Sequence, residues 1–347
     1  MEAGGRRLPE GMKRFGNLFD EVTSTQNFFA AAKKALRKKS HSSYCADFYF
    51  HQETNILQLQ REILNDEYRP QEYKIFTIYE PKERKICCSH VRDRVVHHAI
   101  SRQIEPILER IYIHHSYACR KNKGLHLAVR NCQKFSRNYR YFLKLDIKKL
   151  FENVDHRILK FLLSRKFKDS RLLRLLDVII DHPVPIYQQG RGIPIGNLTS
   201  QHFANFYLHH LDIQIKHGMK VNSYLRYMDD MILMDDNKSK LWEHYLEIKN
   251  FVENCLHVTL NKNVTKIAPI TDGIPFLGFR IFRNLVRMQR ANLIRMKKRI
   301  LLREGMFHQG KISEEDLAKA VNGIVAHIQH ANTRNARLNM LRDQIEA

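Results

Sequence analysis

The sequence predicts an α+β fold on three observations. Residues 141–147 alternate between two faces, with Leu143 and Leu145 on one face and Phe142 and Asp146 on the other, which is typical of a strand. Residues 223–234 contain two apolar runs separated by an Asp-Asp pair, the pattern of a β-hairpin. Around these strands apolar residues recur at helical spacing, so we expect a sheet of non-consecutive segments with helices beside it.

The chain before the first of these strands is predicted to be largely helical, with one hairpin. Residues 15–64 carry a helical pattern, which ends near Pro70 because proline disfavours helix in the residue before it. Residues 74–86 alternate like a hairpin whose turn lies near residues 79–82. The next helix presents its apolar residues on one face: Ile100, Ile104, Ile107, Leu108 and Ile111.

The rest of the chain continues to mix helices with short strands. Ser313 followed by Asp316 is a capping signal for the start of the last helix. The elements expected after residue 147 are, in chain order, helices near 158–162 and 171–181, a Gly- and Pro-rich loop over 190–196, a helix from 203 to 215, a helix over 241–256, strands over 258–267 and 274–282, and helices from 291 onward.

The composition indicates a polyanionic partner. Lys and Arg number 59 against 36 Asp and Glu, which gives a net charge of +23, and nucleic acid suits a chain without membrane segments better than a lipid surface does. A basic ribosomal-type protein is the alternative.

The six cysteines include no Cys-x-x-Cys spacing, so neither a zinc site nor a disulfide framework is indicated. No apolar run approaches the roughly 18 residues of a membrane span, and we expect a cytoplasmic protein with no membrane partner.

Three aspartates are the candidate catalytic residues. Asp229 and Asp230 are adjacent at the expected hairpin turn, where like charges repel and a hard divalent cation would remove the repulsion. Asp146 lies near the end of an otherwise apolar strand, and if that strand pairs with the hairpin the three carboxylates converge. Such a cluster can hold two Mg²⁺ ions about 3.5–4 Å apart for displacement at phosphorus. The alternatives are an exposed turn and an aspartate that begins a helix.

The Tyr-Met-Asp-Asp run at 227–230, preceded by the Leu-Asp-Ile strand at 145–147, resembles the palm of a reverse transcriptase. Further segments match in the expected order over roughly residues 15–285: 79–86, 93–99, 116–120, 193–201 and 276–279. The Ile-Gly-Asn-Leu-Thr-Ser-Gln run at 195–201 resembles reverse transcriptases of diversity-generating retroelements, whereas most relatives carry Gln-Gly and end in Ser-Pro there. A group II intron-like or defence-associated reverse transcriptase is an alternative, as is a non-catalytic nucleic-acid-binding relative of polymerases.

The resemblance implies a right-hand polymerase fold. Residues 1–75 would form an N-terminal helical extension and the start of the fingers, residues 76–283 the fingers and an antiparallel-sheet palm, and residues 284–347 a helical thumb. The implied activity is copying of a template RNA into cDNA, with frequent errors at template adenines. The implied partners are template RNA, the RNA/cDNA duplex, dNTPs and a small basic accessory protein that forms a ring, in a bacterium, archaeon or phage.

The resemblance also implies roles for single residues. The two Mg²⁺ ions, which Mn²⁺ could replace, would be held by three carboxylates and one backbone carbonyl: Asp146, Asp229, Asp230 and Ile147. Six residues would contact the incoming nucleotide: Lys82, Arg84, Phe151, Ile195, Gly196 and Gln201. Six others would contact template or primer: Arg94, Arg120, Lys123, Phe276, Leu277 and Gly278.

The side chains themselves support some of these roles. Arg84 suits bidentate phosphate binding because its planar fork matches the oxygens, while Lys82 could equally be a solvated surface residue. Phe151 lies five positions after Asp146, where an aromatic ring would clash with a ribose 2′-hydroxyl; the alternative is a core phenylalanine. Ile195 offers no hydrogen bond beside the nucleotide, and its alternative role is packing beneath the following helix.

Overall fold

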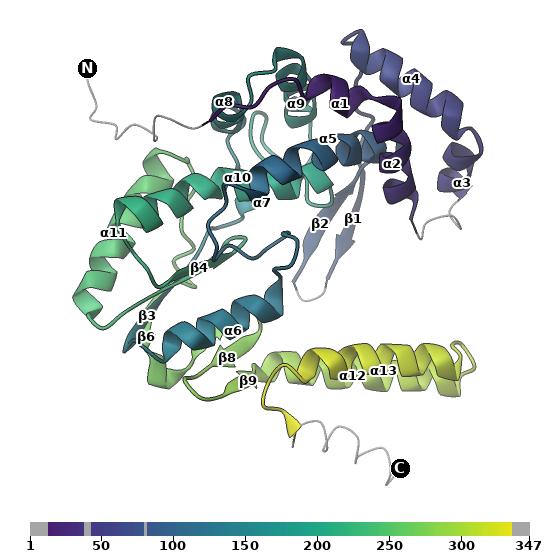
Figure 1. Ribbon diagram of the computed structural model, residues 1–347. Helices are drawn as coiled ribbons and strands as arrows, with labels where there is room; N and C mark the ends of the chain where they lie inside the picture. Colours follow the sequence, from purple (N-terminus) through teal and green to yellow (C-terminus); the bar gives the residue numbers. More distant parts are fainter. Residues whose placement is uncertain (1–12, 38–42, 80–81, 335–347) are drawn as a thin grey trace, which may run out of the picture. The chain divides into compact units, whose positions relative to one another are not determined.

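The computed structural model describes residues 13–37, 43–79 and 82–334 (Figure 1). The chain divides into two compact units, each made of separate stretches of sequence. The first unit comprises residues 1–114, 147–220 and 248–260, and the second comprises residues 115–146, 221–247 and 261–347. Both units contain helices and antiparallel strands, which confirms the predicted α+β class.

The first unit begins with helices α1 (Phe19–Thr23), α2 (Thr25–Leu36), α3 (Ser43–Phe50) and α4 (Gln52–Leu64), and a longer helix, α5 (Val91–Glu109), packs along α2. Buried side chains of small volume, such as Ala31, Ala32 and Ala99, let α2 and α5 approach each other. The Asn27 side-chain amide then donates to the carbonyls of Val22 and Ala99, each at 3.0 Å. These contacts produce the helical N-terminal region that the sequence predicted.

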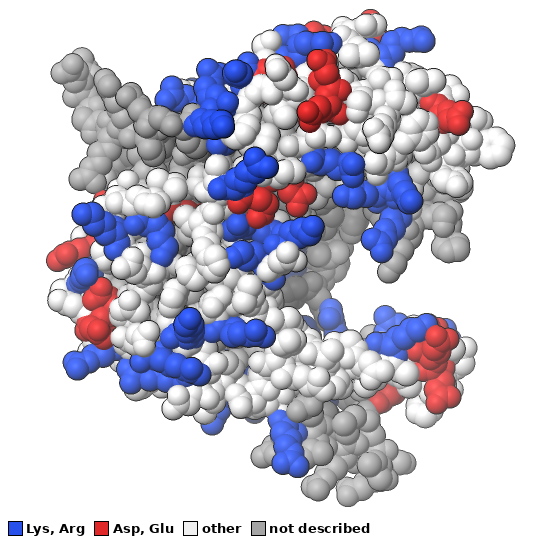
Figure 2. Space-filling model, in the orientation of Figure 1, with Lys and Arg blue, Asp and Glu red and all other residues white. Residues whose placement is uncertain are grey.

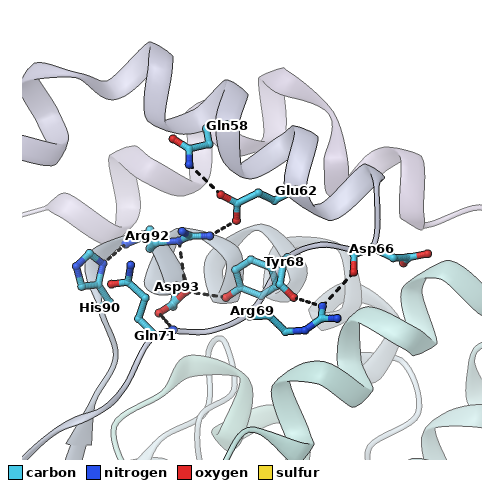
Figure 3. Close-up of polar contacts among 9 residues, drawn as sticks. All are labelled: Gln58, Glu62, Asp66, Tyr68, Arg69, Gln71, His90, Arg92 and Asp93. Atoms are coloured by element: carbon cyan, nitrogen blue, oxygen red, sulfur yellow. Dashed lines mark hydrogen bonds and ion pairs between the residues drawn. The ribbon is translucent and has the colours of Figure 1, made fainter.

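A polar network joins α4 to α5 (Figure 3). Asp93 is buried and accepts hydrogen bonds from the Tyr68 hydroxyl at 2.8 Å and the Gln71 backbone N–H at 2.9 Å. Arg92 forms an ion pair with Glu62 of α4. Burial raises the pKa of Asp93 and raises that of Tyr68 well above its usual range. The network therefore holds polar groups in a buried place where each would be costly without its partner.

The remainder of the first unit consists of one hairpin and the helices that follow. Strands β1 (Lys74–Ile78) and β2 (Arg84–Cys88) pair antiparallel with Ile78 opposite Arg84, which confirms the predicted hairpin. Asp155 and Asp169 accept backbone N–H bonds as N-caps of α8 and α9. The helices are α7 (Leu150–Asn153), α8 (His156–Lys166), α9 (Ser170–Asp181) and α10 (Leu198–Ile213), which ends in a π-helical turn at Gln214–Gly218.

The second unit is built on a four-stranded antiparallel sheet in the order β4-β5-β3-β6. Its strands are β3 (Tyr141–Asp146), β4 (Tyr224–Tyr227), β5 (Asp230–Asp235) and β6 (Lys266–Pro269). A separate three-stranded meander contains β7 (Ile274–Phe276), β8 (Phe279–Ile281) and β9 (Val286–Met288). Helix α6 (Leu125–Ser136) packs against both sheets, as Figure 1 shows. Sheet, meander and α6 share one apolar core, with Phe142, Ile232, Phe276 and Cys132 fully buried in it.

The last helices form a hairpin. Helices α12 (Arg290–His308) and α13 (Glu314–Ile328) lie side by side (Figure 1). The Ser313 hydroxyl accepts from the Asp316 backbone N–H at 3.2 Å, which confirms the predicted cap.

Helix α11 (Lys238–Asn254) begins in the second unit and ends in the first. None of the helices that the structure describes is both long and apolar enough to cross a membrane.

Three predicted elements differ from the structure. The strand expected over 258–267 is broken: Leu260 makes an isolated pairing with Ile147, and a continuous strand begins only at Lys266. The strand expected over 274–282 is a hairpin, because Leu277 (φ 50°) and Gly278 (φ 84°) turn the chain back. The segment expected to be a helical thumb from residue 284 also begins with a strand, β9, which pairs with β8.

Tyr68→Phe should lower the free energy of unfolding by about 1–3 kcal/mol, because it leaves a buried carboxylate with one hydrogen bond fewer. The ring, only 2% exposed in its pocket, is retained. Chemical denaturation measures the change. Tyr49→Phe is the matched control, since Tyr49 is 67% exposed and its hydroxyl is solvated. Equal stabilities of the two variants would show that the hydrogen bond from Tyr68 to Asp93 does not stabilise the fold.

Candidate active site

Asp229 and Asp230 occupy the tip of the β4–β5 hairpin, as predicted. Tyr227 ends β4 directly opposite Asp230, the first residue of β5, so Met228 and Asp229 form the turn. Met228 has a left-handed backbone (φ 55°), which is uncommon for a residue with a side chain. The Arg226 guanidinium is fully buried and donates to the Met228 carbonyl at 3.0 Å. A buried guanidinium therefore stabilises the turn through its hydrogen bond to the Met228 carbonyl.

Arg226 also ties a neighbouring segment to the hairpin. Its backbone N–H donates to the His115 carbonyl at 2.9 Å, and its carbonyl accepts from the Tyr117 N–H at 3.0 Å. Arg226 is not among the site residues predicted from the sequence. The signal was present, because a charged residue stands inside an otherwise apolar strand, and such a residue is rarely buried without partners.

Asp146 lies directly opposite Asp230 in the register of β3 and β5. This pairing gathers the three aspartates at one end of the sheet, which is the arrangement expected from the sequence. The Asn261 side-chain amide donates to Asp146 Oδ1 at 3.1 Å, and the Asn261 backbone N–H donates to the Asp146 carbonyl at 2.8 Å. Asn261 is a second residue that the sequence did not reveal, since it lies 115 positions further along the chain.

Asp230 is a largely enclosed carboxylate. Its side chain is 17% exposed; Oδ2 accepts from Lys144 Nζ at 3.2 Å, while Oδ1 is buried without a hydrogen-bond partner. Burial raises the pKa of Asp230 to about 7; Lys144 opposes the rise, and the charges of Asp146 and Asp229 add to it. The charges of Asp146 and Asp229 both act on the Asp230 carboxyl, in keeping with the register that brings the three residues together.

The donor set fits a divalent cation. A buried carboxylate oxygen without a partner, next to like charges that repel it, is what a hard cation would stabilise. Within the described part of the chain, however, no three His, Cys, Asp or Glu side chains are already close enough to hold a metal ion. The three carboxylates therefore lie at the same end of the sheet, but their oxygens are not yet arranged to coordinate one ion.

The candidate nucleotide-binding residues lie in the first unit, several of them near β2. The Ile195 carbonyl accepts from the Cys87 N–H at 2.8 Å, so the 195–196 loop runs beside this strand. A Cβ on Gly196 (φ 127°) would lie 2.6 Å from the Cys87 carbonyl oxygen, which explains why a glycine is needed. Arg84 begins β2 and is exposed, as is Lys82 in the turn before it.

Most polar residues of the 195–201 segment are buried. Asn197, Thr199 and Ser200 are each at most 3% exposed. The Asn197 side chain bonds to Ser89 and Tyr73, and Thr199 Oγ1 lies 3.0 Å from His97 Nδ1. The polar side chains at 197 and 199 thus hold the start of α10 in place, and the polar side chain of this segment that remains partly exposed is the one at residue 201.

Two further nucleotide candidates are partly buried. Gln201 lies in the first turn of α10, and Phe151 lies in the short helix α7. The Phe151 carbonyl accepts from the Ile193 N–H at 2.7 Å. That bond places Phe151 beside the Gly- and Pro-rich loop that leads to Ile195.

The basic candidates for nucleic-acid contact make internal contacts. Arg94 Nη2 lies 3.3 Å from Cys45 Sγ, and Arg120 donates to the Ser116 carbonyl at 2.9 Å. Lys123 Nζ lies 5.6 Å from the centre of the Tyr117 ring. All three side chains are half-buried, so each presents only part of its charge at the surface.

The turn at 276–278 differs from the expectation in one respect. Phe276 is fully buried in the apolar core, so its side chain cannot reach a nucleic acid. Gly278 is favoured by its φ of 84°, and the Asn292 side chain of α12 lies where a Cβ would be; Asn292 Nδ2 donates to the Gly278 carbonyl at 3.0 Å. Primer contact at Gly278 stays a prediction, and the Asn292 side chain lies beside this glycine.

Comparison with known proteins agrees with this geometry. The profile of the family described as reverse transcriptase (RNA-dependent DNA polymerase) matches residues 79–281, which include all three aspartates. The chain belongs to this family. It is therefore an enzyme of the RNA-directed DNA polymerase class, as the sequence predicted.

Individual relatives are distant. Protein YkfC of Escherichia coli K12 is 26% identical over 274 residues, which cover 66% of this chain and 71% of YkfC. Group II intron-encoded protein LtrA of Lactococcus lactis is 25% identical over 167 residues, covering 46% of this chain but only 28% of LtrA. Among solved structures, apo telomerase from Candida tropicalis, truncated from its C-terminal domain, aligns with a TM-score of 0.47 at 14% identity, covering 69% of this chain and 60% of that one.

Gly196→Ala should destabilise the protein by about 3 kcal/mol or more, because a Cβ would add a backbone clash to an unfavourable φ. It should also raise the KM for dNTP if the 195–196 loop contacts the nucleotide. Gly190→Ala is the matched control: its φ of 74° is also positive, but nothing lies within 4 Å of a Cβ there. It should lose only about 1–2 kcal/mol. Thermal unfolding measures both variants. If Gly196→Ala and Gly190→Ala lower the stability equally, the 195–196 loop can move to make room for the Cβ.

Proposed function

We propose that the protein copies a template RNA into cDNA by two-metal-ion nucleotidyl transfer. The observation that supports this mechanism best is the register of β3 with β5, which sets Asp146 opposite Asp230 beside the turn that carries Asp229. In this proposal the β3–β6 sheet is the palm, the β1–β2 hairpin belongs to the fingers, and α12 and α13 belong to the thumb. The cofactor would be two Mg²⁺ ions, for which Mn²⁺ could substitute.

Asp146, Asp229 and Asp230 would hold the ions with the Ile147 carbonyl. The pairing of Ile147 with Leu260 uses hydrogen bonds made by the residues on either side, Asp146 and Lys148, which leaves the Ile147 carbonyl out of that ladder. When bound, such ions activate the primer 3′-hydroxyl and neutralise charge on the departing pyrophosphate. The chain's own part is to fix the carboxylates on two paired strands.

The incoming dNTP would be bound by residues of the first unit. The exposed Arg84 is suited to the triphosphate, with Lys82 as a second cation. Phe151 would exclude the ribose 2′-hydroxyl and so favour deoxynucleotides. Three positions would contact the base pair being formed: Ile195, Gly196 and Gln201.

Template and primer would be bound mainly through charge. Figure 2 shows Lys and Arg side chains spread over the visible face, and a net charge of +23 attracts polyanions without regard to sequence. Arg94, Arg120 and Lys123 are the proposed backbone contacts. At the 276–278 turn only the partly exposed Leu277 and the backbone around it remain for primer contact, since Phe276 is buried.

Within the family, we assign the chain to the diversity-generating retroelements, with error-prone copying at template adenines and a small basic oligomeric partner. The support is the Ile-Gly-Asn-Leu-Thr-Ser-Gln run at 195–201. The second candidate is a group II intron-like enzyme, which the similarity to LtrA favours. Sequencing the neighbouring DNA separates them, because only the first needs a template repeat that differs from a coding repeat mainly at adenines.

Asp229→Asn should reduce primer extension on an RNA template at least about a hundredfold, since losing a metal ligand removes several kcal/mol of charge stabilisation. The amide keeps the size of the side chain, so folding and RNA binding should persist. Asp235→Asn, at the other end of β5, removes the same charge and should extend primers normally. An Asp229→Asn protein that extends primers at the wild-type rate would exclude the catalytic role of Asp229, whereas a wild-type protein that binds RNA but extends no primer would favour a non-catalytic nucleic-acid-binding protein.

Ile195→Gln should lower misincorporation opposite template adenine by about tenfold, because an amide near the base pair could penalise a mismatch by about 1.4 kcal/mol. The backbone bond from Cys87 to the Ile195 carbonyl does not depend on the side chain and should survive. Ile195→Val, which stays apolar, is the control and should keep the wild-type errors. Sequencing cDNA made on one template gives the rates; equal adenine error rates for all three proteins would assign Ile195 to packing alone.

A further inference from the structure

We propose that Lys144 is a positioning residue that links the metal-binding aspartates to the 276–278 turn. This inference rests on the polymerase activity proposed above. Lys144 Nζ lies 3.2 Å from Asp230 Oδ2 and 2.7 Å from the Pro275 carbonyl oxygen, so one ammonium joins β5 to β7. The family resemblance gave this lysine no role.

The position of Lys144 in the sheet explains how it reaches both partners. It lies two residues before Asp146 on β3 and therefore faces the same side of the sheet. Its direct neighbour across the ladder is Ile232, so it reaches Asp230 diagonally along β5. Pro275 lies on a different sheet, directly before Phe276. Lys144 thus connects a strand of the main sheet to the first strand of the meander.

The surroundings of Lys144 make these contacts strong. Its side chain is 12% exposed, and that of Asp230 is 17% exposed. Cys132 of α6 is fully buried close by: burial raises the pKa of its thiol, the charge of Asp230 adds to the rise, and that of Lys144 opposes it. With little water near the ammonium, a carboxylate and a carbonyl replace its solvation, and such charge-assisted bonds are stronger than they would be in water.

The contact also determines how Asp230 is presented. Lys144 occupies Oδ2, so the oxygen of this carboxylate left without a partner is Oδ1. A carboxylate fixed in this way loses no side-chain freedom when a cation binds. The same lysine holds the Pro275 carbonyl, so a shift of the 276–278 turn would change the orientation of Asp230. Metal binding and primer contact should therefore respond together when Lys144 is altered.

The test compares Lys144→Met, Lys144→Arg and Lys238→Met. Lys238 is an exposed lysine of α11, so its replacement removes the same charge from the second unit without touching the site. Without metal, hydrogen–deuterium exchange of segment 274–281 should be about tenfold faster in Lys144→Met, the order expected for one lost charge-assisted bond. It should remain near wild type in Lys238→Met, and Lys144→Arg should recover most of the protection.

Primer extension is the second arm. Lys144→Met should raise both the Mg²⁺ concentration for half-maximal rate and the KM for primer–template by about tenfold. Lys238→Met should move neither value, and Lys144→Arg should recover most of both losses. A residue that only stabilises the fold would instead lower the maximal rate with both midpoints unchanged.

The outcomes separate the two proposals. If the wild-type protein does not extend primers, the proposed function fails, while the exchange experiment still decides whether Lys144 holds the turn. If the wild type is active and Lys144→Met changes neither exchange nor the two midpoints, the role of Lys144 is wrong. Should Lys144→Met fail to fold, Lys144→Gln, which keeps a donor without charge, decides by the same measurements.

Discussion

The register between β3 and β5 is the constraint on which the candidate active site depends. It places Asp146 opposite Asp230, although like charges facing each other across a sheet are unfavourable. Apolar pairs further along the same ladder hold it in place, with Leu143 opposite Leu233 and Leu145 opposite Met231, all fully buried. A slip by one residue would turn these side chains to the other face, so burial fixes the carboxylates where repulsion opposes them.

Three polar side chains hold the aspartates and their turn at this end of the sheet. Lys144 takes one oxygen of Asp230, Asn261 binds Asp146, and buried Arg226 supports the turn that carries Asp229. None of these contacts closes the three carboxylates into a finished metal site. Asp230 Oδ1 is buried without a hydrogen-bond partner, so a divalent cation would stabilise it, and paired strands hold it on a rigid scaffold.

In the first unit, hydrogen bonds fix the position of the 195–201 segment. Buried hydrogen bonds of Asn197 and Thr199 hold the start of α10, and a backbone bond ties Ile195 to β2. These bonds leave only a few side chains of the 195–201 segment at the surface. A loop that is fixed on both sides can present Ile195 and Gly196 in one defined position, which a nucleotide pocket requires.

The sequence by itself determined the local elements and the family. Period-two alternation revealed β3 and the β1–β2 hairpin, and two apolar runs around the Asp-Asp pair revealed the β4–β5 hairpin. A Ser-x-x-Asp signal marked the start of α13, and the resemblance of the motifs indicated the enzyme class that the family match confirmed. Only the tertiary structure showed that Phe276 is buried, that Asn292 fills the space beside Gly278, and that Lys144 joins Asp230 to Pro275. The physical reason is that periodicity encodes which face of an element is buried. It does not encode the distant residue that covers that face, because such partners meet only when the chain has folded.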